Sequence, residues 1–167
     1  MKQIPLTQGK FALIDDEDFE FLNQWKWQFS KRYATRSKKR KNSRKSDALY
    51  MHRIIMKVQN IETAEHQEGE VDHINGNGLD NRKENLRVCT HQQNRANTKI
   101  QTNNTSGYKG VTLDREARKR VKRWKVEMKV NSKKIHIGRF LTKEDAAKAY
   151  NQAAIKYYGE YARINII

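Results

Sequence analysis

The sequence predicts an α+β protein built from two parts. In the first part, apolar and polar residues alternate in short runs, the pattern of half-buried antiparallel strands. The last third of the chain holds three more strand patterns and then small residues at helical spacing, which predict a three-stranded antiparallel sheet packed on one helix. Polar residues 98–106 have no periodicity and separate the two parts. We therefore expect domains at 1–97 and 107–167, joined by a linker at 98–106.

The N-terminal part is expected to be a β region. Residues 11–14 form an apolar run, and the acidic residues after it favour a helix N-terminus, so we predict a short helix at 18–24. Residues 25–29 and 33–36 alternate and are predicted as strands. Residues 37–47 are interpreted as a mobile, basic hairpin loop that follows DNA phosphates, with a solvated charged run as the alternative. The contact candidates in this loop are Lys38, Lys39 and Arg40.

The central segment combines two strand patterns with a loop between them. Val71 opens a short strand at 71–73, and residues 86–89 form a short, largely apolar run that is interpreted as the second strand. Gly76 and Gly78 lie between them and make it feasible for the second strand to fold back on the first. Polar and acidic residues 58–70 precede this segment and are interpreted as a linker or an insertion.

The C-terminal part has a clear order of elements. Residues 111–113, 124–130 and 135–137 alternate and predict three strands. Residues 142–145 form a capping box, which predicts the start of a helix. The residues at helical spacing that would face the sheet are Ala146, Tyr150, Ala153 and Tyr157.

The charge points to a polyanionic partner. The chain has 35 Lys and Arg residues against 19 Asp and Glu residues, a formal net charge of +16. A surplus of this size attracts nucleic acid through phosphate neutralisation and counterion release. From charge alone, a merely soluble or ribosome-associated protein is the equal alternative.

Cysteine content and hydropathy exclude other classes. Cys89 is the only cysteine, which excludes an intrachain disulfide framework and a cysteine-rich zinc site. No stretch approaches the roughly 20 apolar residues that cross a bilayer. The N-terminus lacks the apolar core of a signal peptide. We expect a protein of the cytoplasm of a bacterial host cell, without a membrane partner.

A group of polar residues in the central segment matches what phosphodiester hydrolysis requires. The reaction needs a water made nucleophilic and a cation on the developing charge. His73 is a base that can accept a proton near neutral pH. Asp72 and Asn94 offer oxygen ligands of the kind that magnesium takes. Thr90 would cap a helix that brings Asn94 to the two strands.

The same segment resembles the HNH nucleases. Asp72 and His73, then Asn85 twelve residues after the histidine, then Asn94 in the next helix follow the spacing of the HNH motif, and the upstream YMHRIIM is typical of HNH homing endonucleases of phages and mobile introns. The resemblance implies a ββα-metal fold, with His73 as the general base and Asp72 and Asn94 as ligands of a divalent metal, Mg²⁺ or Mn²⁺. Asn85 would orient the histidine and brace the loop.

Other polar residues near the motif receive structural assignments. We assign Asn75, Asn77 and Asn81 to the loop, because Asn-Gly pairs are ordinary turn chemistry. His91 is interpreted as a surface or phosphate-facing residue. His52 is interpreted as a packed residue or a backbone contact rather than a catalytic one.

The C-terminal part resembles the AP2 DNA-binding domain. The residues that carry the resemblance lie at 106–111, 123–128, 137–140, 144–150 and 158–165. That family lays its sheet in the major groove, so the resemblance implies outward DNA contacts from alternate strand residues. The positions that correspond are Lys109, Lys125, Glu127, Lys129, His136 and Arg139. Trp124, Phe140 and Tyr150 correspond to core positions.

The chain also departs from the AP2 pattern. Thr112 and Asp114 stand where the family commonly has arginines, and His136 stands where it has a tryptophan. The family's target preference therefore does not transfer. A longer basic turn at 115–122 is interpreted as a phosphate contact or a solvated loop.

Together these patterns predict a site-specific, metal-dependent HNH endonuclease of the homing type. It would act on double-stranded DNA without a small-molecule cofactor, and its AP2-like domain would supply sequence recognition. The main alternative is a non-catalytic, sequence-specific DNA-binding regulator on the same scaffold. A ribosomal or nucleoid-coating protein is a third class. The sequence leaves open whether the protein is a monomer or a homodimer, and whether it nicks DNA or breaks both strands.

Overall fold

The computed structural model describes residues 1–59, 68–114 and 121–167. The chain forms two compact units, Met1–His91 and Gln92–Ile167. Helices and short antiparallel sheets occur in both, which confirms the α+β class. The predicted linker at 98–106 lies within the second unit, and the proposed domain limits stay predictions.

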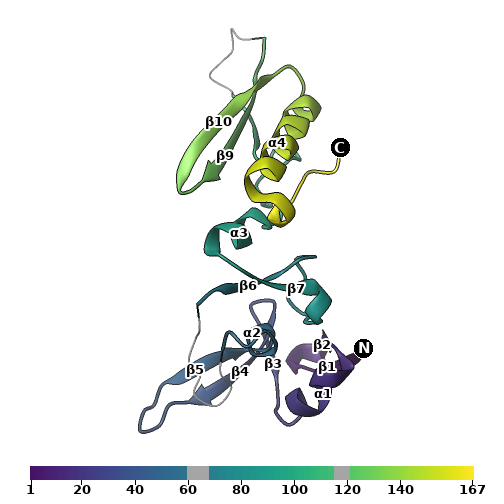
Figure 1. Ribbon diagram of the computed structural model, residues 1–167, viewed down its shortest axis with the longest axis vertical. Coiled ribbons are helices and arrows are strands. Elements are labelled where there is room, and N and C mark those ends of the chain that lie inside the picture. The colour runs from purple at the N-terminus through teal and green to yellow at the C-terminus, as the bar shows by residue number, and fades with distance from the viewer. Residues whose placement is uncertain (60–67, 115–120) are drawn as a thin grey trace. The chain divides into compact units, whose positions relative to one another are not determined.

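The first unit consists of three small antiparallel sheets and two short α-helices (Figure 1). Its strands are β1 (Lys2–Pro5), β2 (Phe11–Ile14), β3 (Gln28–Ser30), β4 (Tyr33–Lys39), β5 (Ser46–Tyr50), β6 (Glu70–His73) and β7 (Leu86–Cys89). Its helices are α1 (Asp16–Leu22), α2 (Met51–Ile55) and the short 3-10 helices η1 (Thr7–Gly9) and η2 (Lys83–Asn85). β1 pairs with β2, β3 with β4 and β4 with β5, and β6 pairs with β7.

One apolar core joins these sheets. Ile4, Ile14 and Leu22 are fully buried, and α2 adds Met51 to the same cluster. Val71 of β6 packs there too, so the strand that carries the candidate site is anchored in the core. Burial of such side chains contributes roughly 1.5–3 kcal/mol each.

Two sequence predictions in this unit were displaced. The helix spans Asp16–Leu22, whereas the prediction was 18–24. The acidic residues were expected to precede the helix, but they lie in its first turn, where their negative charge is stabilised by the positive end of the helix dipole. The predicted strand at 25–29 is reduced to β3, because Trp27 turns inward and its indole N–H donates to the Leu22 carbonyl at 2.9 Å. A side chain drawn into the core in this way ends the alternation.

The basic segment is more ordered than predicted. Residues 37–47 were expected to be a mobile loop, but β4 continues to Lys39 and β5 begins at Ser46, in antiparallel register. The Arg40 Nε donates to Asp47 Oδ1 at 2.8 Å across the hairpin. The sequence did not predict these strands, because an exposed hairpin has polar side chains on both faces and therefore lacks the alternation of apolar and polar residues that marks a strand.

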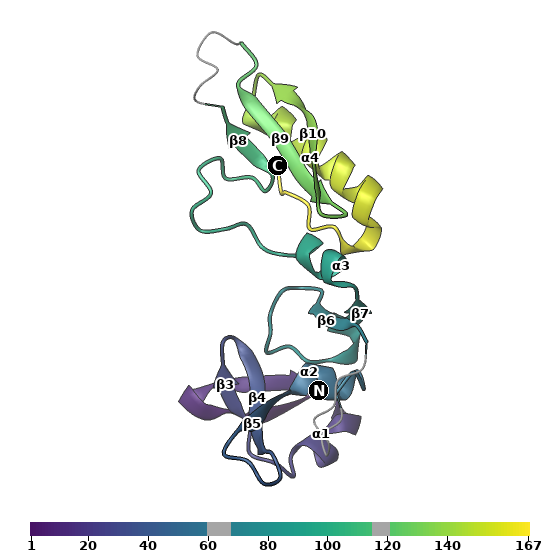
Figure 2. The same ribbon diagram turned by 90° about the vertical axis from the view of Figure 1, so that its left-hand side faces the viewer.

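The second unit is a three-stranded antiparallel sheet with one long helix along it (Figure 2). Its elements are β8 (Val111–Leu113), β9 (Trp124–Val130), β10 (Lys133–Phe140), α4 (Lys143–Tyr158) and the 3-10 helix η3 (Gly159–Tyr161). The predicted strands and helix are therefore confirmed. The Thr142 hydroxyl accepts from the Asp145 backbone N–H at 3.1 Å, which confirms the predicted cap.

The core of this unit lies between the sheet and α4. Val126, Ala146 and Ala147 are fully buried there, and Tyr150 is nearly so. Small residues on α4 let the helix approach the strands closely. Gly110 shows how tight this contact is, since a Cβ on it would lie 2.2 Å from the Tyr150 ring.

A short helix, α3 (His91–Ala96), begins at the last residue of the first unit and continues in the second. It starts directly after Thr90, as predicted. Of the other predictions, most of the linker at 58–70 and most of the basic turn at 115–122 fall outside the described residues. Among the described residues, no helix combines the length and apolar character that crossing a membrane requires.

Candidate active site

Two of the predicted site residues are neighbours on β6. In the antiparallel pair with β7, His73 lies opposite Leu86 and Asp72 opposite Arg87. The strand that follows the loop therefore folds back on the first, which confirms the predicted geometry. Successive residues of a strand point to opposite faces, so the two side chains leave β6 in different directions.

The His73 ring is held by a hydrogen bond to Asn81. The two side chains are joined at 3.1 Å between His73 Nε2 and Asn81 Oδ1. The Asn81 amide nitrogen lies 3.4 Å from the Leu79 carbonyl, to which it donates, so the amide oxygen is the atom that faces the histidine. An amide oxygen only accepts, so Nε2 must carry the hydrogen. In the neutral ring the basic lone pair then belongs to Nδ1.

Asn81 is itself fixed from both sides. Its side chain is fully buried, and its Nδ2 also lies 3.6 Å from Met51 Sδ. Its backbone N–H donates to the Leu13 carbonyl at 2.8 Å, and the Leu13 N–H donates to the Leu79 carbonyl at 2.8 Å. These backbone hydrogen bonds hold the loop against β2, so the Asn81 oxygen that accepts from His73 has little freedom to move.

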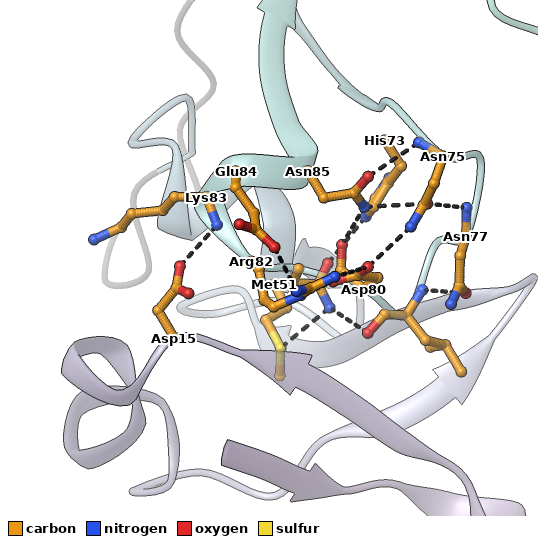
Figure 3. A network of polar contacts seen from close by, with 12 residues as sticks. Asp15, Met51, His73, Asn75, Asn77, Asp80, Arg82, Lys83, Glu84 and Asn85 are labelled. Carbon is orange, nitrogen blue, oxygen red and sulfur yellow. Dashed lines mark hydrogen bonds and ion pairs between the residues drawn. The ribbon is translucent and has the colours of Figure 1, made fainter. Parts of the chain in front are cut away.

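Asn85 organises the loop between the two strands. Its Oδ1 accepts from the Asn75 N–H at 3.0 Å, and its Nδ2 donates to the Asp80 carbonyl at 2.7 Å and to Asn75 Oδ1 at 3.1 Å. Figure 3 shows Asn85 directed into this network with Asn75 and Asp80. The side-chain hydrogen bond at 3.1 Å to the His73 ring comes from Asn81, and the catalytic role of Asn85 stays a prediction.

An ion pair closes the same loop. Asp80 is buried, and both of its carboxylate oxygens accept from the Arg82 guanidinium, at 2.7 and 2.8 Å. Asn75 Nδ2 adds a third bond at 2.9 Å. The bond to Arg82 is the main reason that the pKa of Asp80 is lowered, against the opposing effect of burial. The loop therefore keeps its charge pair over the whole neutral range.

The surroundings of His73 favour its neutral form. The residue is 5% exposed, and its ring lies 4.8 Å from the His52 ring and 5.8 Å from the Tyr33 ring. Burial lowers the pKa of His73, because it disfavours the charged imidazolium. The bond to Asn81 and the charge of Asp72 oppose this shift without reversing it. A neutral imidazole is the form that can accept a proton.

Asp72 faces a different environment. Its side chain is buried, and its Oδ2 accepts from Arg87 NH2 at 2.8 Å and from Arg87 Nε at 3.1 Å. On the same strand, Glu70 pairs with His91 at 2.8 Å. Within the described ranges, no cluster of three or more His, Cys, Asp or Glu residues could hold a metal. The carboxylate of Asp72 and the amide oxygen of Asn94 are nevertheless hard oxygen donors, which suit magnesium or manganese.

Asn94 lies on α3, whose C-terminal end is capped within the second unit. The Lys109 ammonium donates to the Ala96 carbonyl at 2.5 Å and to the Thr98 carbonyl at 2.8 Å. Burial lowers the pKa of Lys109 to about 8, with the charge of Arg163 as the second cause. Lys109 was predicted as a DNA contact, and the structure gives its ammonium partners inside the protein.

The chain resembles known nucleases over the segment just described. Residues 50–96 match a family described as HNH endonuclease. A curated relative, an uncharacterized HNH endonuclease of Acanthamoeba polyphaga mimivirus, is 30% identical over 161 residues, which cover 96% of this chain and 77% of the relative. The chain belongs to the HNH endonuclease family. No solved structure matches it.

Membership in the HNH endonuclease family indicates that the protein is a nuclease that acts on DNA. HNH nucleases generally depend on a divalent metal. The family match spans α2, β6, β7 and α3, and so covers Asp72, His73, Asn85 and Asn94. Asn81 also lies in it, although sequence reasoning gave Asn81 only a loop position. The available signal was weak: Asn81 directly follows Asp80 in a loop with several asparagines, and nothing local shows which one reaches the histidine.

The other candidate DNA contacts lie mostly on one face of the second unit. Cross-strand pairs place Lys125 opposite Arg139 and Glu127 opposite His136, so these four share a sheet face. Lys129 is on the same face, since strand residues two apart point the same way. Val126 and Met128 point to the other face, toward α4. Glu127 is paired with Lys125 at 3.1 Å and Arg139 with Asp114.

Proposed function

We propose that the protein is a site-specific endonuclease of the homing type, which hydrolyses phosphodiester bonds of double-stranded DNA. The observation that carries the proposal is the buried His73 imidazole, held through Nε2 by Asn81 within the segment that matches the HNH family. Such a ring is a general base whose protonation state and direction are set before the substrate arrives.

In the proposed reaction, His73 Nδ1 takes a proton from the water that attacks the scissile phosphorus. The bond from phosphorus to the 3′ oxygen then breaks, and the released 3′ oxygen takes a proton from solvent water, which leaves a 5′-phosphate and a 3′-hydroxyl. The hydrogen bond from His73 to the Asn81 oxygen becomes stronger as the ring gains charge, because hydrogen bonds to charged groups are stronger than neutral ones. Asn85 keeps the loop in the shape that presents Asn81.

Asp72 and Asn94 are the residues proposed to hold a divalent metal. Their oxygen atoms suit Mg²⁺ or Mn²⁺. A bound ion would stabilise negative charge on the phosphate and on the leaving oxygen. Arg87 holds Asp72 Oδ2 at 2.8 Å and so fixes the direction of the carboxylate. Within this proposal, Arg87 orients a ligand and does not contact DNA.

Sequence recognition is assigned to the AP2-like domain in residues 107–167. The sheet face with Lys125, Lys129 and His136 lies opposite the helix-packed face, which suits strand contacts in a major groove. The hairpin with Lys38, Lys39 and Arg40 is proposed to bind phosphates without sequence preference.

The proposal is tested with DNA selected for binding from a random library and inserted in a supercoiled plasmid. With MgCl₂ or MnCl₂, the wild type should cut at the selected site and His73→Ala should bind the same DNA but cut at least 100-fold more slowly, on the order expected for loss of a general base. If His73→Ala cuts as fast as the wild type, the assignment is wrong. Tight binding without cutting by the wild type in either metal would favour the non-catalytic regulator. Strand-resolved mapping of the products separates nicking from double-strand breakage.

A further inference from the structure

The proposed base belongs to a cluster of four rings, in which His52 contacts the other three. The His52 ring lies 4.8 Å from that of His73, 5.0 Å from that of Tyr33 and 5.6 Å from that of Tyr50. The rings come from β4, the end of β5, α2 and β6, so the arrangement depends on the tertiary fold. His52 and His73 meet edge to face, at an interplanar angle of 68°.

Packing alone does not explain a histidine at this position. His52 is 5% exposed, and its Nδ1 is buried without a hydrogen-bond partner among the described residues. A buried polar atom without a partner is destabilising, and a phenylalanine would avoid that loss. Burial, and then the charges of His73 and Arg53, lower the pKa of His52 well below its usual range, so the ring is uncharged at neutral pH.

The bond to Asn81 acts on one atom of the His73 ring. It holds Nε2, and the strand holds Cβ, but neither of these two restraints sets the rotation of the ring about the line between the two atoms. That rotation swings Nδ1, the proposed basic atom. An edge-to-face contact with a second ring opposes the rotation, because it is favourable in one relative orientation.

We propose that His52 is a positioning residue that sets the rotation of the His73 ring and thereby aims the basic nitrogen at the attacking water. This inference rests on the proposed role of His73. The contact is made by the ring, and an imidazole edge that carries an N–H is more positive than a phenyl edge. Activity should therefore follow the order histidine, phenylalanine, leucine at position 52.

The test is a double-mutant cycle with His52→Leu and His73→Ala. Leucine fills the core without offering a ring, so His52→Leu should fold and bind the selected DNA with unchanged Kd. Its single-turnover rate constant for cleavage should fall about tenfold. His52→Phe should recover part of that loss. In the His73→Ala background, His52→Leu should cause no further loss, because the group on which it acts is gone.

Each outcome has a defined meaning. If His52→Leu cuts at the wild-type rate, or if its loss is undiminished in the His73→Ala background, the positioning role is overturned and His52 is only a core residue. If His52→Leu fails to fold, the cycle is run with His52→Phe, whose smaller loss should likewise vanish without His73. If His73→Ala itself retains full activity, the proposed base is wrong and this inference falls with it, which separates the two failures.

Discussion

Replacing Asn81 by alanine tests the central geometry of the site. The change removes the oxygen that lies 3.1 Å from His73 Nε2 and leaves Asp72, His73 and the proposed DNA-binding surfaces in place. Asn81 is fully buried, so it has no route to the substrate. Any effect on cleavage of the folded variant must therefore pass through the His73 ring.

The expected size follows from the charge on the ring. A neutral hydrogen bond is worth about 1 kcal/mol net, and one to a charged group about 1.5–3 kcal/mol. As His73 takes up the proton, the bond to Asn81 changes from the first kind to the second. The difference of roughly 0.5–2 kcal/mol appears only in the transition state, and about 1.4 kcal/mol, within this range, corresponds to a factor of ten in rate. We expect the single-turnover rate constant for cleavage to fall about tenfold, with the Kd for the selected DNA unchanged.

The assay is single-turnover cleavage of the selected DNA at saturating MgCl₂, below the melting temperature of every variant. Asn77→Ala is the matched control: Asn77 lies in the same loop and is exposed, and its side chain accepts from the Leu79 N–H at 3.1 Å without reaching His73. The control should cut like the wild type. If Asn81→Ala is folded and cuts within twofold of the wild-type rate, the reasoning about the ring is refuted.

Three further predictions concern stability and binding. Gly110→Ala should destabilise the second unit by on the order of 3 kcal/mol, because its Cβ would lie 2.2 Å from the Tyr150 ring. Gly107 has a similar positive φ but open space around it, so Gly107→Ala should destabilise by only about 1 kcal/mol. Thermal melts measure both variants, and equal losses would contradict the packing argument. Stability should fall as pH drops below about 6.5, the usual histidine pKa, because burial lowers the pKa values of His52 and His73 and the unfolded chain takes up protons that the folded one refuses. The slope for each histidine is at most about 1.4 kcal/mol per pH unit, and urea titrations at pH 7.5 and 5.5 should show a smaller difference for His52→Phe; an unchanged difference would refute the assignment. Lys129→Ala should weaken DNA binding and reduce the slope of log K against log salt by about 0.9, whereas Lys148→Ala on the exposed side of α4 should leave the slope unchanged.

Periodicity made the pairing of the strands predictable. The largely apolar run at 86–89 predicted a strand that pairs with the Val71 strand over a shared core, and the alternation in 124–130 predicted a half-buried strand against a helix. Both patterns depend on burial, and burial leaves its mark on the local sequence. The same logic failed for the hairpin at 37–47, where neither face of the strands carries an apolar signal.

The partners of single polar atoms were not predictable. Asn75, Asn77 and Asn81 are alike as residues, yet only the last is placed by the backbone of Leu13 beneath His73. The pair of Asp72 with Arg87 follows from the register of β6 and β7, which required the loop length to be resolved first. Such contacts join residues that are distant in sequence or differ by one position in a loop, so composition and spacing do not identify them.

The cap on α3 has a consequence for how this protein could exchange its proposed DNA-recognition part during evolution. The Ala96 carbonyl accepts from Lys109 Nζ at 2.5 Å and from the Arg163 N–H at 3.3 Å, so the helix with Asn94 is completed by residues from both ends of the C-terminal region. A recombination joint within residues 98–106 would bring in a new recognition module but remove both donors from the helix end. A viable chimera would need a joint before His91, so that the whole of α3 is inherited together with its cap.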